Sequence, residues 1–181
     1  MKEPKMSKLF RLAPTPSEES ERLKALLECQ ILDTSAEPVF DAYVRAVAEA
    51  CDTPVALISL VDRHRQWFKA KIGLDVDQTP RDIAFCGHTI LQTEAMVIND
   101  AAEDERFRHN PLVTGEPFIR FYAGVPLRLL AGERLGSLCV IDFKPRTISE
   151  QQLDLLNEQA RQIASILDAR RARFKEPGLA A

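Results

Sequence analysis

The chain has 181 residues, 45% of them hydrophobic and 28% charged, which is typical of one soluble globular domain. Its net charge of −3 provides no positive field for phosphate backbones, so we expect no nucleic-acid partner. The longest apolar run, residues 54–61, is far shorter than the roughly 20 residues of a membrane span, and the N-terminus lacks a signal-peptide core, so we expect a cytoplasmic protein that binds no membrane.

The N-terminal part of the sequence predicts a loose tail and two helices. Residues 1–14 mix Lys, Arg and Pro with isolated apolar residues, which is typical of a flexible segment. Thr15, with a proline and a glutamate shortly after it, has the pattern of a helix N-cap, and leucines at helical spacing extend this helix to about residue 31. A second helix is predicted over residues 37–50, with a buried face made of Val39, Phe40, Tyr43, Val44, Val47 and Cys51.

The central part predicts a β-hairpin followed by a short helix. Two apolar runs, residues 54–62 and 66–73, flank a polar turn, which favours a pair of antiparallel strands. After a loop, a short helix is expected to carry Cys86 and His88. The next strand is predicted over residues 95–100.

The C-terminal part predicts two strands and one long helix. Asp100 has the position of an N-cap for a short helix over residues 101–107. Strands are predicted at 119–129 and 135–142, joined by a tight turn. Ser149 is then expected to cap a helix that continues to about residue 173, before a C-terminal tail. Because consecutive strands are joined by short turns, we predict a single α+β domain over residues 15–173, with an antiparallel sheet and helices packed on it.

Cys86 and His88 lie two positions apart, which raises three interpretations: a nucleophile with its base, a metal site, or a buried thiol beside a hydrogen-bonded histidine. Positions i and i+2 of a helix point about 200° apart, so a helical segment separates the two side chains. Gly87 between them could interrupt the helix. The four cysteines form no CxxC pair, and no histidine spacing is typical of a metal site. We therefore favour a buried Cys86, no metal and no cofactor.

Other candidate chemistry is sparse. Asp100, Asp104 and Glu105 could form a carboxylate cluster, but acids in this position more often stabilise the start of a helix. Phe121 and Tyr122 are neighbours in a predicted strand, so only one of them can face a cavity. Glycine-rich phosphate loops and a serine nucleophile elbow are absent from the sequence. We predict that the protein is not an enzyme.

Several separated segments together carry a family resemblance. They are ILDTSAEPVFD, VALISLVDRHRQWFK, RDIAFCGHTIL, VINDAAEDERFRHNPLVTG, IRFYAGVPL and RLGSLCVID, which occur in this order between about residues 18 and 172. The sequence resembles a GAF domain, and most of all the bacterial subgroup that precedes diguanylate cyclases and sensor histidine kinases.

The resemblance implies a GAF-like, PAS-related fold with a central antiparallel sheet of five or six strands and helices on its faces. It also implies a role in signal transduction, a small-molecule pocket between the sheet and the short helices, and a homodimer through the terminal helices. On this basis the expected ligand contacts are Cys86, His88, Asp100, Phe107 and Tyr122.

Sequence features that known ligand-binding GAF types have and this chain lacks reduce the number of expected ligand classes. The Asn-Lys pair of members that bind cyclic AMP or cyclic GMP does not occur in the chain, and no cysteine lies just before residue 119 for bilin attachment. Free-methionine-sulfoxide reductases use several cysteines in the central region, whereas Cys86 is the only one there. The chain ends after its last helix without room for a kinase or cyclase, so we expect it to signal through another molecule.

Three functional hypotheses follow. The first is a free-standing sensory module that binds an unknown small molecule and signals through a partner protein. The second is a dimerisation or protein-interaction module with a vestigial pocket. The third is a redox sensor or reductase based on Cys86, which needs a thiol with a low pKa and some exposure.

Overall fold

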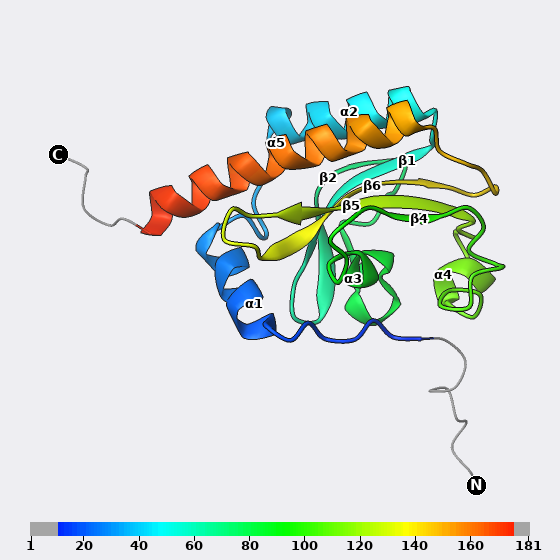
Figure 1. Cartoon of the computed structure of the whole chain (residues 1–181), viewed down its shortest axis with the longest axis horizontal. Coiled ribbons are helices and arrows are strands. Elements are labelled where there is room, and N and C mark those ends of the chain that lie inside the picture. The colour runs from blue at the N-terminus through cyan, green and yellow to red at the C-terminus, as the bar shows by residue number, and fades with distance from the viewer. Residues whose placement is uncertain (1–10, 176–181) are drawn as a thin grey trace, which may run out of the picture.

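A computed structural model describes residues 11–175. Of the predicted tails, 1–14 and 174–181, the parts 1–10 and 176–181 lie outside the described residues. The fold is built on six antiparallel strands in the spatial order β3-β2-β1-β6-β5-β4 (Figure 1). The strands are β1 (Val55–Val61), β2 (Arg65–Ile72), β3 (Gln78–Pro80), β4 (Met96–Ile98), β5 (Phe121–Arg128) and β6 (Arg134–Asp142). The predicted antiparallel sheet of five or six strands is confirmed.

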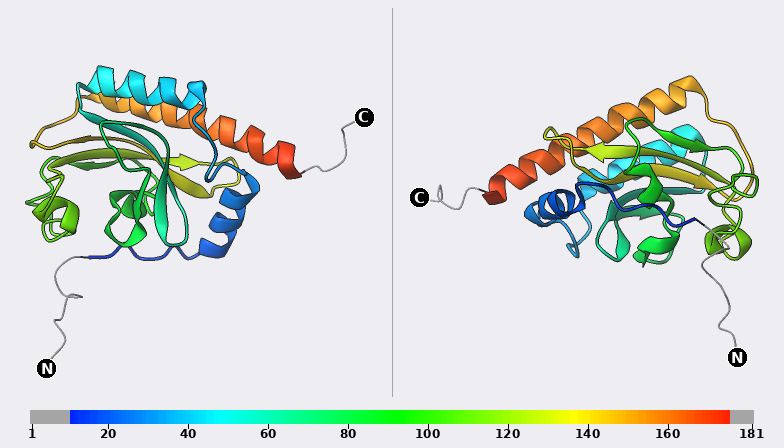
Figure 2. Two further views of the ribbon diagram at one scale, coloured as in Figure 1. Left: turned by 180° about the vertical axis from the view of Figure 1, so that it is seen from behind. Right: turned by 60° about the horizontal axis from the view of Figure 1, so that its bottom comes forward.

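Helices cover both faces of the sheet. Two long helices, α2 (Pro38–Cys51) and α5 (Glu150–Lys175), lie side by side on one face (Figure 1, Figure 2). The short helices α3 (Phe85–Thr89) and α4 (Pro111–Thr114) lie on the opposite face, and α1 (Glu19–Glu28) packs beside β6 and α5. The α+β class with helices on the sheet faces is therefore confirmed.

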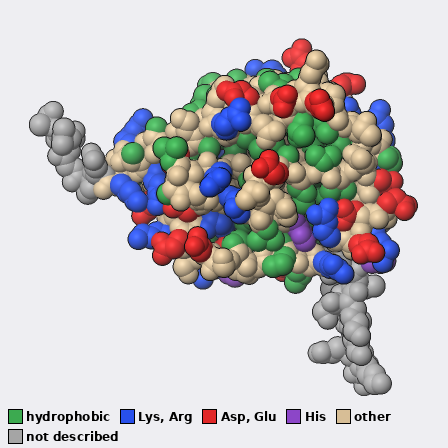
Figure 3. Space-filling model, in the orientation of Figure 1, with side chains coloured by type: hydrophobic (Ala, Val, Ile, Leu, Met, Phe, Trp, Pro, Cys, Tyr) green, Lys and Arg blue, Asp and Glu red, His purple; other side chains and the backbone are tan. Residues whose placement is uncertain are grey.

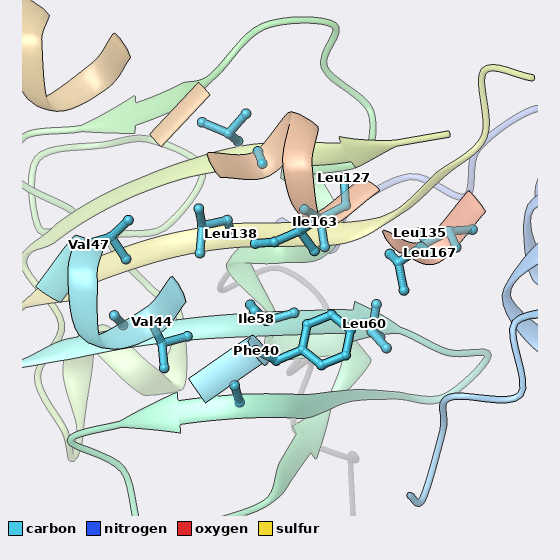
Figure 4. Packing of buried hydrophobic residues seen from close by; sticks show 14 of the residues in the cluster. Phe40, Val44, Val47, Ile58, Leu60, Leu127, Leu135, Leu138, Ile163 and Leu167 are labelled. Atoms are coloured by element: carbon cyan, nitrogen blue, oxygen red, sulfur yellow. The ribbon is translucent and has the colours of Figure 1, made fainter. Parts of the chain in front are cut away.

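Because successive strand residues point to opposite faces, the sheet separates two hydrophobic clusters. The cluster under the long helices contains Phe40 and Val44 of α2, which point toward β1, and Ile163 and Leu167 of α5, which cover β5 and β6 (Figure 4). The second cluster lies between the sheet and the short helices. Burial on both faces explains why β1 is apolar at every position except Ser59.

The start of α5 was predicted correctly, because its signal is local. The Ser149 hydroxyl accepts a hydrogen bond from the Gln152 backbone N–H at 3.1 Å, and the Gln152 side-chain oxygen accepts one from the Ser149 backbone N–H at 3.0 Å. This reciprocal capping box satisfies two N–H groups at the helix end.

The start of α1 was predicted wrongly. The helix begins at Glu19 rather than Thr15, and no side chain caps it. Residues 11–16 instead run extended beneath α3, where the Arg11 carbonyl oxygen lies 3.2 Å from Nε2 of His88 (Figure 1). Tertiary contact of this segment with α3 outweighs the local capping pattern. Val39, predicted to be buried in α2, is 44% exposed.

The predicted helix over residues 101–107 is also wrong. Asp100 Oδ1 accepts a hydrogen bond from the Ala102 N–H at 3.0 Å, and Asp104 Oδ1 accepts one from the Arg106 N–H at 2.9 Å. These side chains form two successive Asx turns, which compete with helical hydrogen bonding. The structure further contains strand β3, which lies in a segment predicted as loop, and the 3-10 turn η2 (Arg81–Ile83). It also contains helix α4, where the Asn110 side-chain oxygen accepts a hydrogen bond from the Leu112 backbone N–H at 2.9 Å and so caps the helix.

The surface carries charges of both signs. Where α1 meets the C-terminal half of α5, basic and acidic side chains lie together (Figure 3), and Arg171 pairs with Glu28 and Glu133 at 2.7 Å and 3.0 Å. Within residues 11–175, none of the helices combines the length and the hydropathy needed to cross a bilayer.

Candidate functional site

A small cavity of about 80 Å³ lies between the sheet and the short elements on the face opposite α2 and α5. The strands β1, β2, β3, β5 and β6 contribute side chains, and the short helices contribute Phe85, Cys86 and Leu112. The loops close the sides. None of the described lining residues carries a charge. The lining consists of Leu57, Gln66, Phe68, Leu74, Val76, Thr79, Phe85, Cys86, Leu112, Pro117, Ile119, Tyr122, Ile141 and Phe143.

A buried hydroxyl and thiol cluster lies at one side of this cavity. The phenol oxygen of Tyr122 is 2.7 Å from Thr89 Oγ1 and 3.4 Å from Ser137 Oγ, and the phenol donates a hydrogen bond to Cys86 Sγ at 3.4 Å. Tyr122 is fully buried. A buried phenol requires such partners, because an unpaired hydroxyl costs about 1–3 kcal/mol.

Gly124 provides the space that Tyr122 needs. Both residues lie on β5 and face the same side of the sheet, and a Cβ atom at position 124 would overlap the phenol ring, with the Tyr122 Cζ carbon only 2.6 Å away. A glycine at this position therefore allows the phenol to lie flat over the strand and reach α3.

Cys86 is buried but lies in polar surroundings. A hydrogen bond with Cys139 lowers the pKa of the Cys86 thiol, burial opposes that shift, and further hydrogen bonds with Ser137, Tyr122 and Ser59 support it. Interaction with Cys86 and burial raise the pKa of Cys139. If one thiol of this pair ionises, it is Cys86.

His88 lies on the other side of α3 from Cys86, as the helical phase predicts. Its ring contacts Phe107 edge-on with ring centroids 4.8 Å apart, and its Nε2–H donates a hydrogen bond to the Arg11 carbonyl oxygen. Burial lowers the pKa of His88 and favours the neutral imidazole. The imidazole and the Cys86 thiol thus have separate partners.

The structure brings Cys86 and Tyr122, two of the five predicted ligand contacts, to the cavity. His88, Phe107 and Asp100 are not among its lining residues. Phe107 stacks on Phe85 at 4.1 Å and so supports the cavity wall from behind, whereas Asp100 holds the Asx turn. Ligand binding by these five residues stays a prediction.

Sequence reasoning missed Ser137 and Cys139 of β6 and Gln66 and Thr79 of the β2–β3 side. Gln66 accepts a hydrogen bond from Ser59 at 3.1 Å and donates one to Thr79 at 2.7 Å. Alternation along β6 places Ser137, Cys139 and Ile141 on one face, and this period was a usable signal. Across residues 11–175, no group of three or more His, Cys, Asp or Glu side chains is placed to hold a metal ion.

The sequence model of the GAF domain matches residues 35–167. The chain belongs to the GAF domain family. The resemblance deduced from the sequence motifs is thereby confirmed.

One protein of similar sequence carries the name of an enzyme. The chain is 46% identical over 149 residues to "Cyclic di-GMP phosphodiesterase PA2567" of Pseudomonas aeruginosa. The match covers 82% of this chain but 25% of the relative, so the chain spans about a quarter of the length of that protein. This finding contradicts our prediction of a protein that is not an enzyme. A role in signalling is supported.

Solved structures share the fold at low sequence identity. The GAF domain of a phosphoenolpyruvate-protein phosphotransferase from Acinetobacter superposes with a TM-score of 0.62 at 22% identity, covering 86% of this chain and 98% of that one. The corresponding domain from Coxiella burnetii gives 0.63 at 18% identity, covering 88% and 100%. A domain of a putative two-component sensor histidine kinase from Sinorhizobium meliloti 1021 gives 0.61 at 20% identity, covering 79% and 98%.

Proposed function

We propose that this GAF domain is a sensory module of cyclic di-GMP signalling. It binds a small, uncharged and mainly apolar molecule in the cavity, and occupancy of the cavity regulates a cyclic di-GMP phosphodiesterase. The observation that carries the proposal is the apolar cavity under α3. The similarity to the Pseudomonas aeruginosa phosphodiesterase supports the choice of output.

The lining determines the class of ligand. Phosphate groups are bound by Arg, Lys or clustered N–H donors, and the described lining offers no basic side chain, so cyclic di-GMP itself does not match the cavity. A cavity of about 150 Å³ holds benzene, and this one is about half that volume. The ligand is therefore a molecule of a few non-hydrogen atoms, or a larger one that displaces the exposed rim residues Val76 and Phe143.

The sheet offers a route from the cavity to the long helix. On β5, Tyr122 faces the cavity, whereas Leu127 faces the opposite side and packs in the cluster that α5 covers. Movement of β5 on ligand binding therefore changes the surface on which α5 packs. We propose that α5 passes this change to the output, and that the predicted homodimer through the terminal helices provides the contact.

Thermal unfolding in the presence of small neutral molecules tests ligand binding. A ligand at one hundred times its Kd stabilises a protein by about 2.7 kcal/mol, and its carboxylate or phosphate analogue should have no effect. Leu112→Trp fills the cavity and should abolish the stabilisation. Leu155→Trp, on half-buried α5 surface, is the matched control and should retain it. Failure of every neutral molecule to stabilise the folded chain would favour the alternative of an interaction module with a vestigial pocket.

A chimera tests the output. In the Pseudomonas aeruginosa phosphodiesterase, the matching 149-residue segment is replaced by that of this chain. Hydrolysis of cyclic di-GMP should change when the stabilising ligand is added, and the same chimera with Leu112→Trp should not respond. A ligand that binds the chimera without changing hydrolysis would contradict the proposed output while leaving ligand binding intact. Sedimentation of the unmodified chain tests the homodimer.

A further inference from the structure

A row of hydrogen-bonded polar side chains reaches the wall of the otherwise apolar cavity. Ser59 is fully buried in β1, and its hydroxyl donates a hydrogen bond to Gln66 Oε1 at 3.1 Å. The Gln66 Nε2–H donates in turn to Thr79 Oγ1 at 2.7 Å. Gln66 and Thr79 both line the cavity. We call Ser59, Gln66 and Thr79 the polar row. Apolar side chains would fill the same space without the cost of burying polar groups, so packing alone does not account for the row.

Strand register places the polar row on the cavity side of the sheet. Leu57 and Val61 of β1 belong to the cluster under the short helices, and Ser59 lies between them on the same face. Gln66 of β2 pairs with Val61, and Thr79 of β3 pairs with Gln66. Because paired residues of neighbouring strands share a face, the row crosses β1, β2 and β3 side by side. It ends on β3, which is an edge strand of the sheet.

The direction of the hydrogen bonds leaves two donor protons at the end of the row. Thr79 Oγ1 accepts from Gln66, so the hydroxyl proton of Thr79 is free to donate, and the Gln66 amide has a second Nε2–H. Across residues 11–175, neither of these protons has an acceptor among the side-chain hydrogen bonds. Gln66 is 5% exposed and Thr79 is half-buried. The row therefore presents two donors at the cavity wall.

Two neighbouring donors limit the chemistry of a matching ligand. They are complementary to a single oxygen with two lone pairs, such as that of a carbonyl group. A carboxylate also has such oxygens, but none of the described lining residues carries the positive charge that a buried carboxylate needs. A purely apolar molecule would shield both donors from water without replacing their hydrogen bonds, which lowers its affinity.

We propose that Thr79 and Gln66 bind the carbonyl oxygen of a small neutral ketone or ester. The Thr79 hydroxyl donates to one lone pair of this oxygen and the Gln66 amide to the other, while the apolar part of the molecule lies against the apolar lining of β1, β2 and β6. This inference rests on the proposed ligand binding in the cavity and adds the chemical class of the ligand. The bound carbonyl joins β2 to the edge strand β3.

Two probes of equal size test the carbonyl contact: butanone and its alkene analogue, in which a CH₂ group replaces the carbonyl oxygen. Their dissociation constants are measured on the whole chain by NMR titration. Thr79→Val removes the hydroxyl and keeps the branched shape. It should weaken butanone binding about 3- to 10-fold, the effect of one lost neutral hydrogen bond, and should leave alkene binding unchanged or slightly tighter.

Two further variants are the controls for this titration. Thr79→Ser keeps the hydroxyl and should retain the wild-type ratio of the two dissociation constants. Thr93→Val, at an exposed site away from the cavity, should change neither constant. An equal effect of Thr79→Val on both probes would overturn the proposal.

A second measurement needs only the wild type, and so decides even where a variant folds poorly. The carbonyl carbon of a ketone resonates further downfield when its oxygen accepts hydrogen bonds. The signal of carbonyl-labelled butanone, extrapolated to saturation, should therefore lie downfield of its position in hexane, and a signal at the hexane position would contradict the proposal. Binding of the alkene without the ketone would overturn the carbonyl contact and leave ligand binding intact. Binding of neither probe would also overturn it, whereas the proposed ligand binding fails only if every neutral molecule leaves thermal unfolding unchanged.

Discussion

The phenol oxygen of Tyr122 lies 2.7 Å from the hydroxyl oxygen of Thr89, and this contact joins β5 to α3 beside the cavity. Both groups are fully buried. The same phenol also contacts Cys86 and Ser137, so one side chain organises the polar side of the site. A change that moves this phenol should affect the stability of the whole face.

Gly124→Ala tests the placement of Tyr122. The added Cβ overlaps the phenol, so we expect a loss of about 1–3 kcal/mol in the free energy of unfolding, measured with urea. In a Tyr122→Phe background the nearest atom, the phenol oxygen, is gone, and the penalty should be smaller. An equal penalty in both backgrounds would show that the phenol oxygen is not the atom that Gly124 accommodates.

His88 should make stability depend on pH near neutrality. Burial lowers its pKa below 6.5, so between the folded and unfolded pKa values the unfolded chain binds more protons. The free energy of unfolding should therefore increase as the pH rises to about 6.5 and decrease as the pH is lowered from 6.5. His88→Gln, which keeps an N–H donor for the Arg11 carbonyl, should flatten the slope in urea titrations. His64→Gln, at an exposed site, should leave the slope as it is.

Glu19 should contribute to acid stability. Burial alone would raise its pKa, but hydrogen bonds and ion pairs with Arg22 and Arg81 lower it from 4.5 to about 2. This contribution is present above about pH 4.5 and is lost as the pH falls toward 2. Glu19→Gln should lower the free energy of unfolding at neutral pH and weaken its fall in acid. Glu21→Gln on the exposed face of α1 is the control, and an equal effect of both would contradict the assignment.

Ser149→Ala should remove the capping box of α5. We expect the free energy of unfolding to fall by about 1 kcal/mol, because one N–H at the helix start loses its acceptor. Ser165→Ala lies on the exposed middle of the same helix and should leave stability unchanged or slightly raised. Unfolding monitored by circular dichroism reports both. A loss in the Ser165 variant as large as that in Ser149→Ala would count against a specific cap.

Local patterns in the sequence predicted most elements well. The Ser149 cap, the apolar run of β1 and the turn before β2 depend on residues close together in the chain, and each was found. The prediction failed where distant contacts decide, as at Thr15, where the extended N-terminal segment packs on α3. It also failed at Asp100 and Asp104, where side chains close turns that the helix pattern did not reveal.

The sequence by itself determined the antiparallel α+β fold, the family and the opposite directions of Cys86 and His88, because periodicity, turns and helical phase are properties of neighbouring residues. Only the tertiary structure decided which side chains surround the cavity and that Cys86 and Cys139 belong to one buried cluster. Strand order and helix docking bring residues together that are far apart along the chain, and a single sequence carries no local signal for such contacts.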